Sequence, residues 1–325
     1  MAHIGIDVSK GKLDLCWLRE NGKMKTKVFT NHPKHYPALM DWLTRQTGEQ
    51  AGDLRVYLEA TGIYHEPVTE WLHEVGVQVH VVNPAQVRHY AQALGNSGKT
   101  DKKDSQLLAR YGLDRQPPRW KPEPAGIRRL RRLASRLETV QQDIQREQNR
   151  REKAQFSRDT ETVSSIDQVL LALQSEAKRL REEIKDHIDS DGDLQRDQEL
   201  LKSIPGIGDA TSVHLMVLLR GKVFRSARQA AAFVGLVPRE WTSGTSVRSR
   251  PRLTKKGAPM MRRRLYMAAV VASRHNPMVE ALYTRLRQAG KPPMSALGAA
   301  MRKLVHIAFG VLHRQTPFQT QPVGG

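Results

Sequence analysis

The sequence has a single cysteine, few aromatic residues and no long apolar run. Aromatic residues make up 6% of the 325 residues, and Cys16 is the only cysteine. One thiol can form neither an internal disulfide nor a cysteine-based zinc site, which favours a reducing cytosol. No apolar run approaches the ~20 residues that cross a bilayer. The first residues, MAHIGIDVSK, do not resemble a signal peptide. We therefore expect a cytoplasmic protein, with Cys16 as a small core residue of the run LDLCWL.

Acidic residues are also in deficit. The chain has 53 Lys and Arg against 33 Asp and Glu, a formal net charge of +20. Such a basic chain favours a polyanionic partner, of which nucleic acid is the commonest. Residues 110–132 hold eight basic and two acidic residues, and residues 239–264 hold nine and one, whereas residues 161–202 hold six and eleven. Two basic segments around an acidic spacer predict two nucleic-acid contact regions.

The first third of the chain predicts an α/β domain. The short runs HIGIDVS, KLDLCWL and KTKVFTN follow one another across turns, which is typical of an antiparallel meander. Helical patterns over 34–47, 66–76, from Pro84 and over 99–113 alternate with the strand-like runs DLRVYLEA and VQVHVVN. The predicted order is βββαβαβα, in a mixed sheet with parallel neighbours after the meander.

The middle third predicts a helical hairpin, which we expect to join protomers into at least a dimer. Its apolar residues recur at spacings close to a coiled-coil seam. They are Leu130, Leu133, Leu137, Val140 and Ile144, and then Ile166, Val169, Leu173, Ala177, Leu180 and Ile184. Prolines precede this coiled-coil hairpin (127–188), and SDGD follows it. The predicted domains are 1–125, 126–195 and 196–325.

The last third is predicted to be helical, and it is basic. SIPGIGDATS (203–212) predicts the turn of a helix-hairpin-helix, whose backbone N–H groups at a helix N-terminus suit a phosphate. An ordinary turn between two helices is an equally good interpretation. WTSGTSVRSRPRLTKKG (241–257) is expected to be a polar loop.

Four carboxylates fall where a metal site requires them. Asp7 and Glu59 end predicted strands, and Asp101 and Asp104 lie three apart at the start of a helix, on one side of it. Acids that converge repel one another unless a cation neutralises them. Oxygen ligands select Mg²⁺ or Mn²⁺, and two such ions ~3.5–4 Å apart stabilise the entering and leaving oxygens of phosphoryl transfer. We therefore predict that these acids hold Mg²⁺ or Mn²⁺.

Together these motifs resemble one family. The acids lie in I-G-I-D, Y-L-E-A-T-G and K-T-D-K-K-D, the arrangement of the RNase H fold in its RuvC form. G-I-D-V-S-K, E-A-T-G-x-Y and K-T-D-x-x-D narrow the resemblance, and the last third adds S-I-P-G-I-G, A-A-F-V-G-L-V-P, S-G-T-S-V-R, K-K-G and R-R-R-L. Over essentially its whole length the chain resembles the DEDD transposases of insertion-sequence family 110, a group that includes the pilin-gene invertases.

The resemblance implies an architecture and partners. The fold would be an α/β RNase H-like (RuvC-like) catalytic domain, a helical coiled-coil hairpin and a mainly α-helical transposase-type domain. Members of the family recombine DNA at specific sites, guided by a structured noncoding RNA that pairs with target and donor DNA. The expected setting is the bacterial cytoplasm, in association with the nucleoid, and the expected assembly is a dimer or tetramer.

The resemblance also implies residue roles. The residues that match the family's metal ligands are Asp7, Glu59, Asp101 and Asp104, and Ser243 matches its DNA-cleaving serine. A serine agrees with the chemistry, because a covalent phosphoserine keeps the phosphodiester energy while strands exchange without ATP. From sequence alone Thr245, Ser246 and Ser249 are rivals. We expect a composite site in which Ser243 attacks a phosphate held by the four acids. The linker and the hairpin are long enough for the two parts to come either from one chain or from different protomers.

Other functions stay open at this point. A metal-dependent DNA nuclease or junction resolvase would use the same acids with water as the nucleophile, and would leave no protein-linked DNA. A protein-only DNA invertase would need no guide RNA. A non-enzymatic nucleic-acid scaffold would bind DNA unchanged after the acids are removed.

Overall fold

The computed structural model describes residues 1–60, 62–95, 101–243, 247–254, 257 and 259–320, without the side chains of 101–102, 239–243 and 247–252. The chain divides into two compact units, Met1–Pro122 and Glu123–Gly325. Each unit is described by itself.

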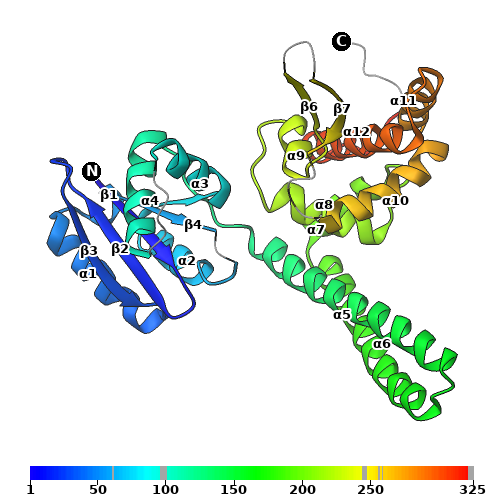
Figure 1. Cartoon of the computed structure of the whole chain (residues 1–325), viewed down its shortest axis with the longest axis horizontal. Helices are drawn as coiled ribbons and strands as arrows, with labels where there is room; N and C mark the ends of the chain where they lie inside the picture. The colour runs from blue at the N-terminus through cyan, green and yellow to red at the C-terminus, as the bar shows by residue number, and fades with distance from the viewer. Residues whose placement is uncertain (61, 96–100, 244–246, 255–256, 258, 321–325) are drawn as a thin grey trace. The chain divides into compact units, whose positions relative to one another are not determined.

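Five strands form one mixed sheet in the first unit, in the order β3-β2-β1-β4-β5 (Figure 1). β1, β2 and β3 pair antiparallel, which confirms the predicted meander, and β4 and β5 follow on the other side of β1 as parallel neighbours. The strands are β1 (Ala2–Val8), β2 (Lys12–Leu18), β3 (Met24–Thr30), β4 (Leu54–Glu59) and β5 (Gln78–Val82).

Helices cover both faces of this sheet because alternate strand residues are apolar on each side. α1 (Tyr36–Thr47) and α2 (Glu66–Glu74) pack on the face that carries Ile4, Ile6 and Leu58. The opposite face receives α3 and α4, through a cluster that includes Val82 and Leu108. The remaining elements of the unit are η1 (Pro33–His35), η2 (Ala51–Asp53), α3 (Pro84–Ala93) and α4 (Asp101–Arg115). Cys16 is fully buried, as predicted.

The two edges of the sheet differ. After α4 the chain runs along β5, where Trp120 N donates to Val79 O at 2.7 Å and His80 Nδ1 lies 2.7 Å from Pro117 O. At the other edge, β3 is largely exposed and carries lysines at alternate positions.

The second unit begins with two long antiparallel helices, α5 (Ala125–Phe156) and α6 (Thr160–Asp189), which form the predicted hairpin (Figure 1). Most residues of the expected seam lie between them, but Val169 is 45% exposed and Leu170 is buried in its place. The spacing after Ile166 is therefore four residues rather than three. Near its base the hairpin shares a core with the helices that follow.

The rest of the second unit is helical apart from one β-hairpin. Its elements are α7 (Gly192–Lys202), α8 (Asp209–Arg220), α9 (Ala227–Phe233), β6 (Pro238–Ser243), β7 (Val247–Leu253), α10 (Pro259–His275), α11 (Pro277–Gln288) and α12 (Pro293–Arg314). Among the described helices, α12 alone is long and apolar enough to cross a membrane, and 56% of its apolar window is buried inside the protein. Its buried side chains belong to the core, which explains their apolar character.

The prediction of a polar loop over 241–257 is wrong for most of its length, because β6 and β7 occupy much of this segment. β6 and β7 pair antiparallel around residues 244–246, which lie outside the described residues. The segment has residues that favour strands on either side of Gly244, namely Trp241, Thr242 and Val247. Its polar composition led to the prediction of a loop in place of a β-hairpin. Thr254 N donates to Val237 O at 3.0 Å and closes the base of the hairpin.

Candidate active site

Two predicted metal ligands, Asp7 and Glu59, lie beside each other at the carboxyl edge of the sheet. β1 and β4 are parallel, and their register pairs Ile6 with Leu58. One residue further on, Asp7 and Glu59 therefore occupy the same level of adjacent strands, which are ~4.8 Å apart. Both side chains are partly buried. The register thus brings together two acids that are far apart in the sequence.

A third carboxylate, Asp14, lies on the other side of Asp7. The antiparallel register of β1 and β2 pairs Asp7 with Asp14, so the two side chains share a face of the sheet. Asp14 is 8% exposed, and its Oδ2 lies 3.1 Å from Lys12 Nζ. This residue was missed from the sequence, because Asp14 was considered only as part of the strand KLDLCWL. An acid within an otherwise apolar strand was the available signal.

The helix that carries Asp101 and Asp104 lies directly on β1. A Cβ at Gly5 would lie 2.0 Å from the carbonyl oxygen of Ser105, so only glycine permits this approach. Farther along α4, a Cβ at Gly112 would lie 2.2 Å from the ring of Tyr57, whose hydroxyl lies 3.0 Å from His3 Nδ1.

This packing sets the direction of α4. The helix passes from above Gly5 toward His3, so its first turn, residues 101–104, lies toward the Asp7 end of β1. Asp104 is partly buried and directly precedes the fully buried Ser105. Asp101 begins the helix as predicted, but its side chain lies outside the described residues. The described side chains include no group of three or more His, Cys, Asp or Glu placed to hold a metal ion.

The predicted nucleophile, Ser243, belongs to the second unit. It is the last residue of β6, and the ladder pairs it with Val247 across the turn. Its side chain lies outside the described residues, as do the rivals Thr245 and Ser246. The base of the hairpin is fixed on α12, because a Cβ at Gly298 would lie 3.2 Å from Leu253 Cδ1.

Some arginines of the basic segment 239–264 stabilise the fold. Arg262 Nη1 donates to Val234 O at 3.1 Å and to Gly257 O at 3.0 Å. Arg264 Nη2 lies 3.9 Å from Glu138 Oε1, between α10 and α5. Burial raises the pKa of Glu138. Burial, with Arg264 close by, lowers the pKa of His214 to about 4. This segment therefore has arginines with structural partners as well as those expected to contact phosphate.

The predicted turn at 203–212 joins α7 and α8 as expected. Gly206 has a φ of +99°, and a Cβ there would lie 2.8 Å from that of Ala272, so the turn packs closely on α10. Lys202 Nζ lies 2.6 Å from Asp209 Oδ1 at the first residue of α8. The carboxylate of Asp209 therefore already lies at the helix N-terminus that the sequence suggested as a phosphate-binding site.

Comparison with known proteins gives the family. Residues 4–154 match the DEDD transposase family of IS110, and residues 198–284 match the transposase family of IS116, IS110 and IS902. The pilin gene-inverting protein of Moraxella bovis is 31% identical over 318 residues, which cover 97% of each chain. The chain belongs to the IS110 family of transposases. A transposase for the insertion sequence element IS1111A of Coxiella burnetii is 24% identical over 84% of this chain and 78% of its own.

Membership of the IS110 family makes the protein a DNA transposase or recombinase, and hence an enzyme. Transposases of the DEDD type are usually metal-dependent. The first IS110 match includes all four predicted acids, and the second includes Ser243.

Proposed function

We propose that this IS110 transposase cuts and rejoins DNA through a serine-linked intermediate, with divalent metal held by the acids of an RNase H-like domain. The observation that carries the proposal is the β1–β4 register, which sets Asp7 beside Glu59. The sheet order supports an RNase H-like (RuvC-like) fold, since three antiparallel strands are followed by two parallel neighbours on the other side of β1.

The proposed metal ligands are Asp7, Glu59, Asp101 and Asp104. Their oxygen donors are those that Mg²⁺ and Mn²⁺ prefer. When bound, the metal would supply positive charge that stabilises the phosphoryl oxygens in the transition state. The packing of α4 on Gly5, which sets the first turn of the helix toward Asp7, supports the inclusion of Asp104.

The proposed nucleophile is Ser243. Its Oγ attacks the phosphorus, and the bond from phosphorus to the 3′ oxygen breaks. The 5′-phosphate stays on the serine, whose proton goes to solvent, and the leaving oxygen takes up a proton to become a 3′-OH. Attack on the phosphoserine by the 3′-OH of another strand reverses these steps. Because each ester is exchanged for another, no ATP is needed.

The remaining parts of the proposal concern partners. We propose target and donor DNA, a structured guide RNA, a coiled-coil hairpin over 127–188 that joins protomers, and a cytoplasmic, nucleoid-associated setting. Leu171 and Phe156 are exposed on the hairpin, which supports association through it. Domains 1–125, 126–195 and 196–325 would carry the metal, the hairpin and the serine.

A second candidate function has a specific observation in its favour. The relatives from Moraxella bovis and Moraxella lacunata are both named pilin gene-inverting proteins, and each is 31% identical over 97% of this chain. A protein-only DNA invertase is therefore the main alternative. A metal-dependent nuclease or junction resolvase, with water in place of Ser243, is the other.

The test of the serine is denaturing electrophoresis of end-labelled DNA after cleavage is stalled. We expect label to migrate with the wild-type protein and with Ser249→Ala, but not with Ser243→Ala. Asp104→Ala should bind DNA and fail to cleave it. If no label migrates with the wild-type protein, or if Ser243→Ala still recombines, the water-based nuclease takes the place of the serine mechanism.

Two further assays test the partners. Sequencing of copurified nucleic acid should identify a structured RNA, and recombination by rigorously RNA-free protein would support the protein-only invertase instead. Mixing Ser243→Ala with Asp7→Ala protein should restore activity if a composite site draws its parts from different protomers, because one mixed site then holds both intact parts. No recovery would place both parts in one chain.

A further inference from the structure

The C-terminal half of α12 forms one wall of a pocket that the sites above do not use. Its volume is about 540 Å³, within the ~300–1,000 Å³ range of small-molecule sites. Met278 of α11 and the tail residues 316–319 complete it. Its three basic side chains are Lys303, His306 and Arg314.

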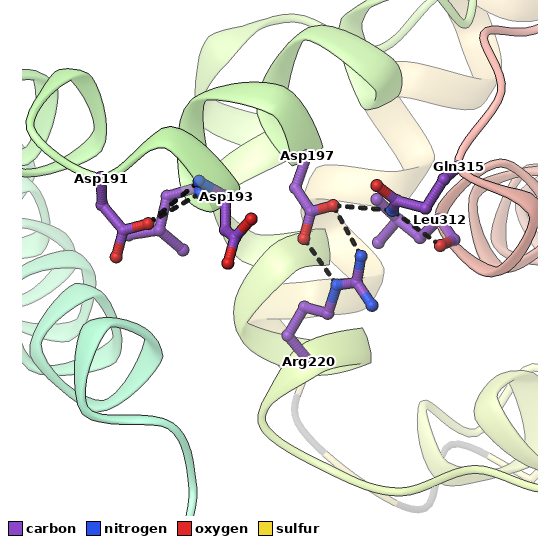
Figure 2. A network of polar contacts seen from close by, with 7 residues as sticks. Asp191, Asp193, Asp197, Arg220, Leu312 and Gln315 are labelled. Carbon is purple, nitrogen blue, oxygen red and sulfur yellow. Dashed lines mark hydrogen bonds and ion pairs between the residues drawn. The ribbon is translucent and has the colours of Figure 1, made fainter.

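The tail wall is held in place by hydrogen bonds. Gln315 ends α12 in the left-handed region, with a φ of +54°, and its Nε2 donates to Asp197 Oδ1 at 3.0 Å (Figure 2). Three residues later, Phe318 N donates to Ser203 Oγ at 2.8 Å. Phe318 packs against the core of the second unit. The pocket is thus formed by anchored backbone on both sides.

The charge of the pocket favours an anion. No carboxylate is found among its described lining residues, and Lys303 and Arg314 lie on it. His306 Nε2 is buried and has no hydrogen-bond partner among the described residues. Burial and then the neighbouring Arg302, Lys303 and Arg228 lower the pKa of His306, so the pocket's positive charge comes from Lys303 and Arg314.

The rest of the lining favours a flat apolar group beside that anion. Phe318, Ile307 and Met278 contribute an aromatic ring and two aliphatic side chains. An aromatic ring next to cations is the combination that binds single-stranded nucleic acid, in which the base stacks and the phosphate pairs with Lys or Arg.

We propose that this pocket binds one unstacked nucleotide of a single-stranded nucleic acid, with its phosphate on Lys303 and Arg314 and its base against Phe318. The pocket adjoins the turn at 203–208, because Ser203 holds the tail and the buried Asn276 Nδ2 donates to Pro205 O at 3.4 Å. This inference rests on the proposed function only in requiring that the protein binds nucleic acid.

The test is fluorescence anisotropy of the full-length protein with a labelled 12-nucleotide DNA, the same sequence as RNA, and the DNA duplex. Lys303→Gln with Arg314→Gln should weaken single-strand binding by about tenfold or more. It should also lower the slope of log K against log salt by ~0.7 for each phosphate that the variant no longer neutralises. The matched control is Arg274→Gln with Arg285→Gln, two exposed cations of the same unit outside the pocket, which should change single-strand binding less than threefold.

The stacking part has its own variant. Phe318→Leu keeps apolar volume and removes the ring, and it should weaken single-strand binding roughly 5- to 100-fold while duplex binding stays unchanged. Weaker binding of RNA alone, of DNA alone or of both supports the pocket and identifies the strand. Pocket variants that bind like wild type, or a control pair as weak as the pocket pair, overturn the proposal. A wild-type protein that binds no nucleic acid would contradict the proposed function itself.

Discussion

Asp197 accepts two hydrogen bonds from the guanidinium of Arg220, from Nε at 2.5 Å and from Nη2 at 2.6 Å (Figure 2). Asp197 is 5% exposed and also accepts from Gln315, so one carboxylate joins α7, α8 and the end of α12. The hydrogen bond with Asp197 is the main cause that raises the pKa of Arg220. A planar guanidinium that binds both carboxylate oxygens fixes the relative orientation of two helices.

Asp197→Asn should destabilise this part of the protein because it leaves the Arg220 charge without its partner. Breaking a buried pair costs ~3–5 kcal/mol, but Arg220 is 37% exposed and water screens its charge, so we expect about 2 kcal/mol. The control is Asp209→Asn, whose 76% exposed side chain pairs with Lys202 and should cost under ~1 kcal/mol. Hydrogen exchange of peptides from α7 and α8 measures both, and equal effects would contradict the role given to Asp197.

Gly5→Ala should disturb the sheet and the candidate site together. The new Cβ would meet the backbone of α4 at Ser105, and overpacking of this kind costs ~1–3 kcal/mol. Because the same contact sets the first turn of α4 toward Asp7, DNA cleavage should fall as well. Gly11→Ala is the matched control, since a Cβ there meets no atom within 4 Å. Thermal unfolding and cleavage assays should separate the two variants, and wild-type behaviour of Gly5→Ala would refute the close approach.

Asp14→Asn should weaken the binding of the Mg²⁺ that cleavage requires, without altering DNA binding. A divalent ion ~6 Å from a carboxylate gains ~1.4 kcal/mol even at the dielectric constant of water. Removal of this charge also leaves Lys12 to oppose the metal. We expect the half-saturating Mg²⁺ concentration to rise about tenfold. Asp41→Asn makes the same charge change on α1, against the opposite face, and should leave the Mg²⁺ titration as in wild type. An unchanged titration for Asp14→Asn would exclude Asp14 from the site.

His214 should make the protein sensitive to acid. Its pKa is lowered from 6.5 to about 4 in the folded state, by burial first and then by Arg264. Between these values the unfolded chain binds the proton and the folded chain does not, so stability falls as the pH drops from about 6.5 to 4. The decrease is roughly 2–3 kcal/mol at pH 4. His214→Gln should flatten this part of the profile of unfolding temperature against pH, whereas the exposed His275→Gln should not. Parallel profiles for wild type and His214→Gln would contradict this prediction.

The sequence predicts most of the first unit because its strands are short apolar runs with clear turns between them. The same runs locate Asp7 and Glu59 at strand ends, and parallel pairing then brings them together. The position of Asp14 beside Asp7 follows from the register of β1 and β2, and the residue pattern of β2 alone does not reveal that register. Ser243 is proposed from family resemblance alone, since its sequence neighbours Thr245, Ser246 and Ser249 have similar chemistry.

Features that depend on distant contacts were not predictable. Asp197 lies in an acidic stretch that suggests a solvated surface, and nothing local indicates its pairing with Arg220. The prediction that Val169, and not Leu170, is buried in the hairpin failed for a different reason. Spacings of three and four residues both keep an apolar stripe on a helix, so sequence alone left the register of α6 undetermined.

The edges of the five-stranded sheet are both protected against pairing with a strand of another molecule. An unprotected edge strand invites pairing with a strand of another molecule, and natural proteins prevent this with lysines or with a covering segment. Both devices are present here, with Lys25 and Lys27 exposed on β3 and the segment around Trp120 along β5. A strand added at β3 would bring two rows of lysine ammonium groups together. Both edges of this sheet are thus guarded against pairing with another copy, which protects the transposase from strand-linked aggregation.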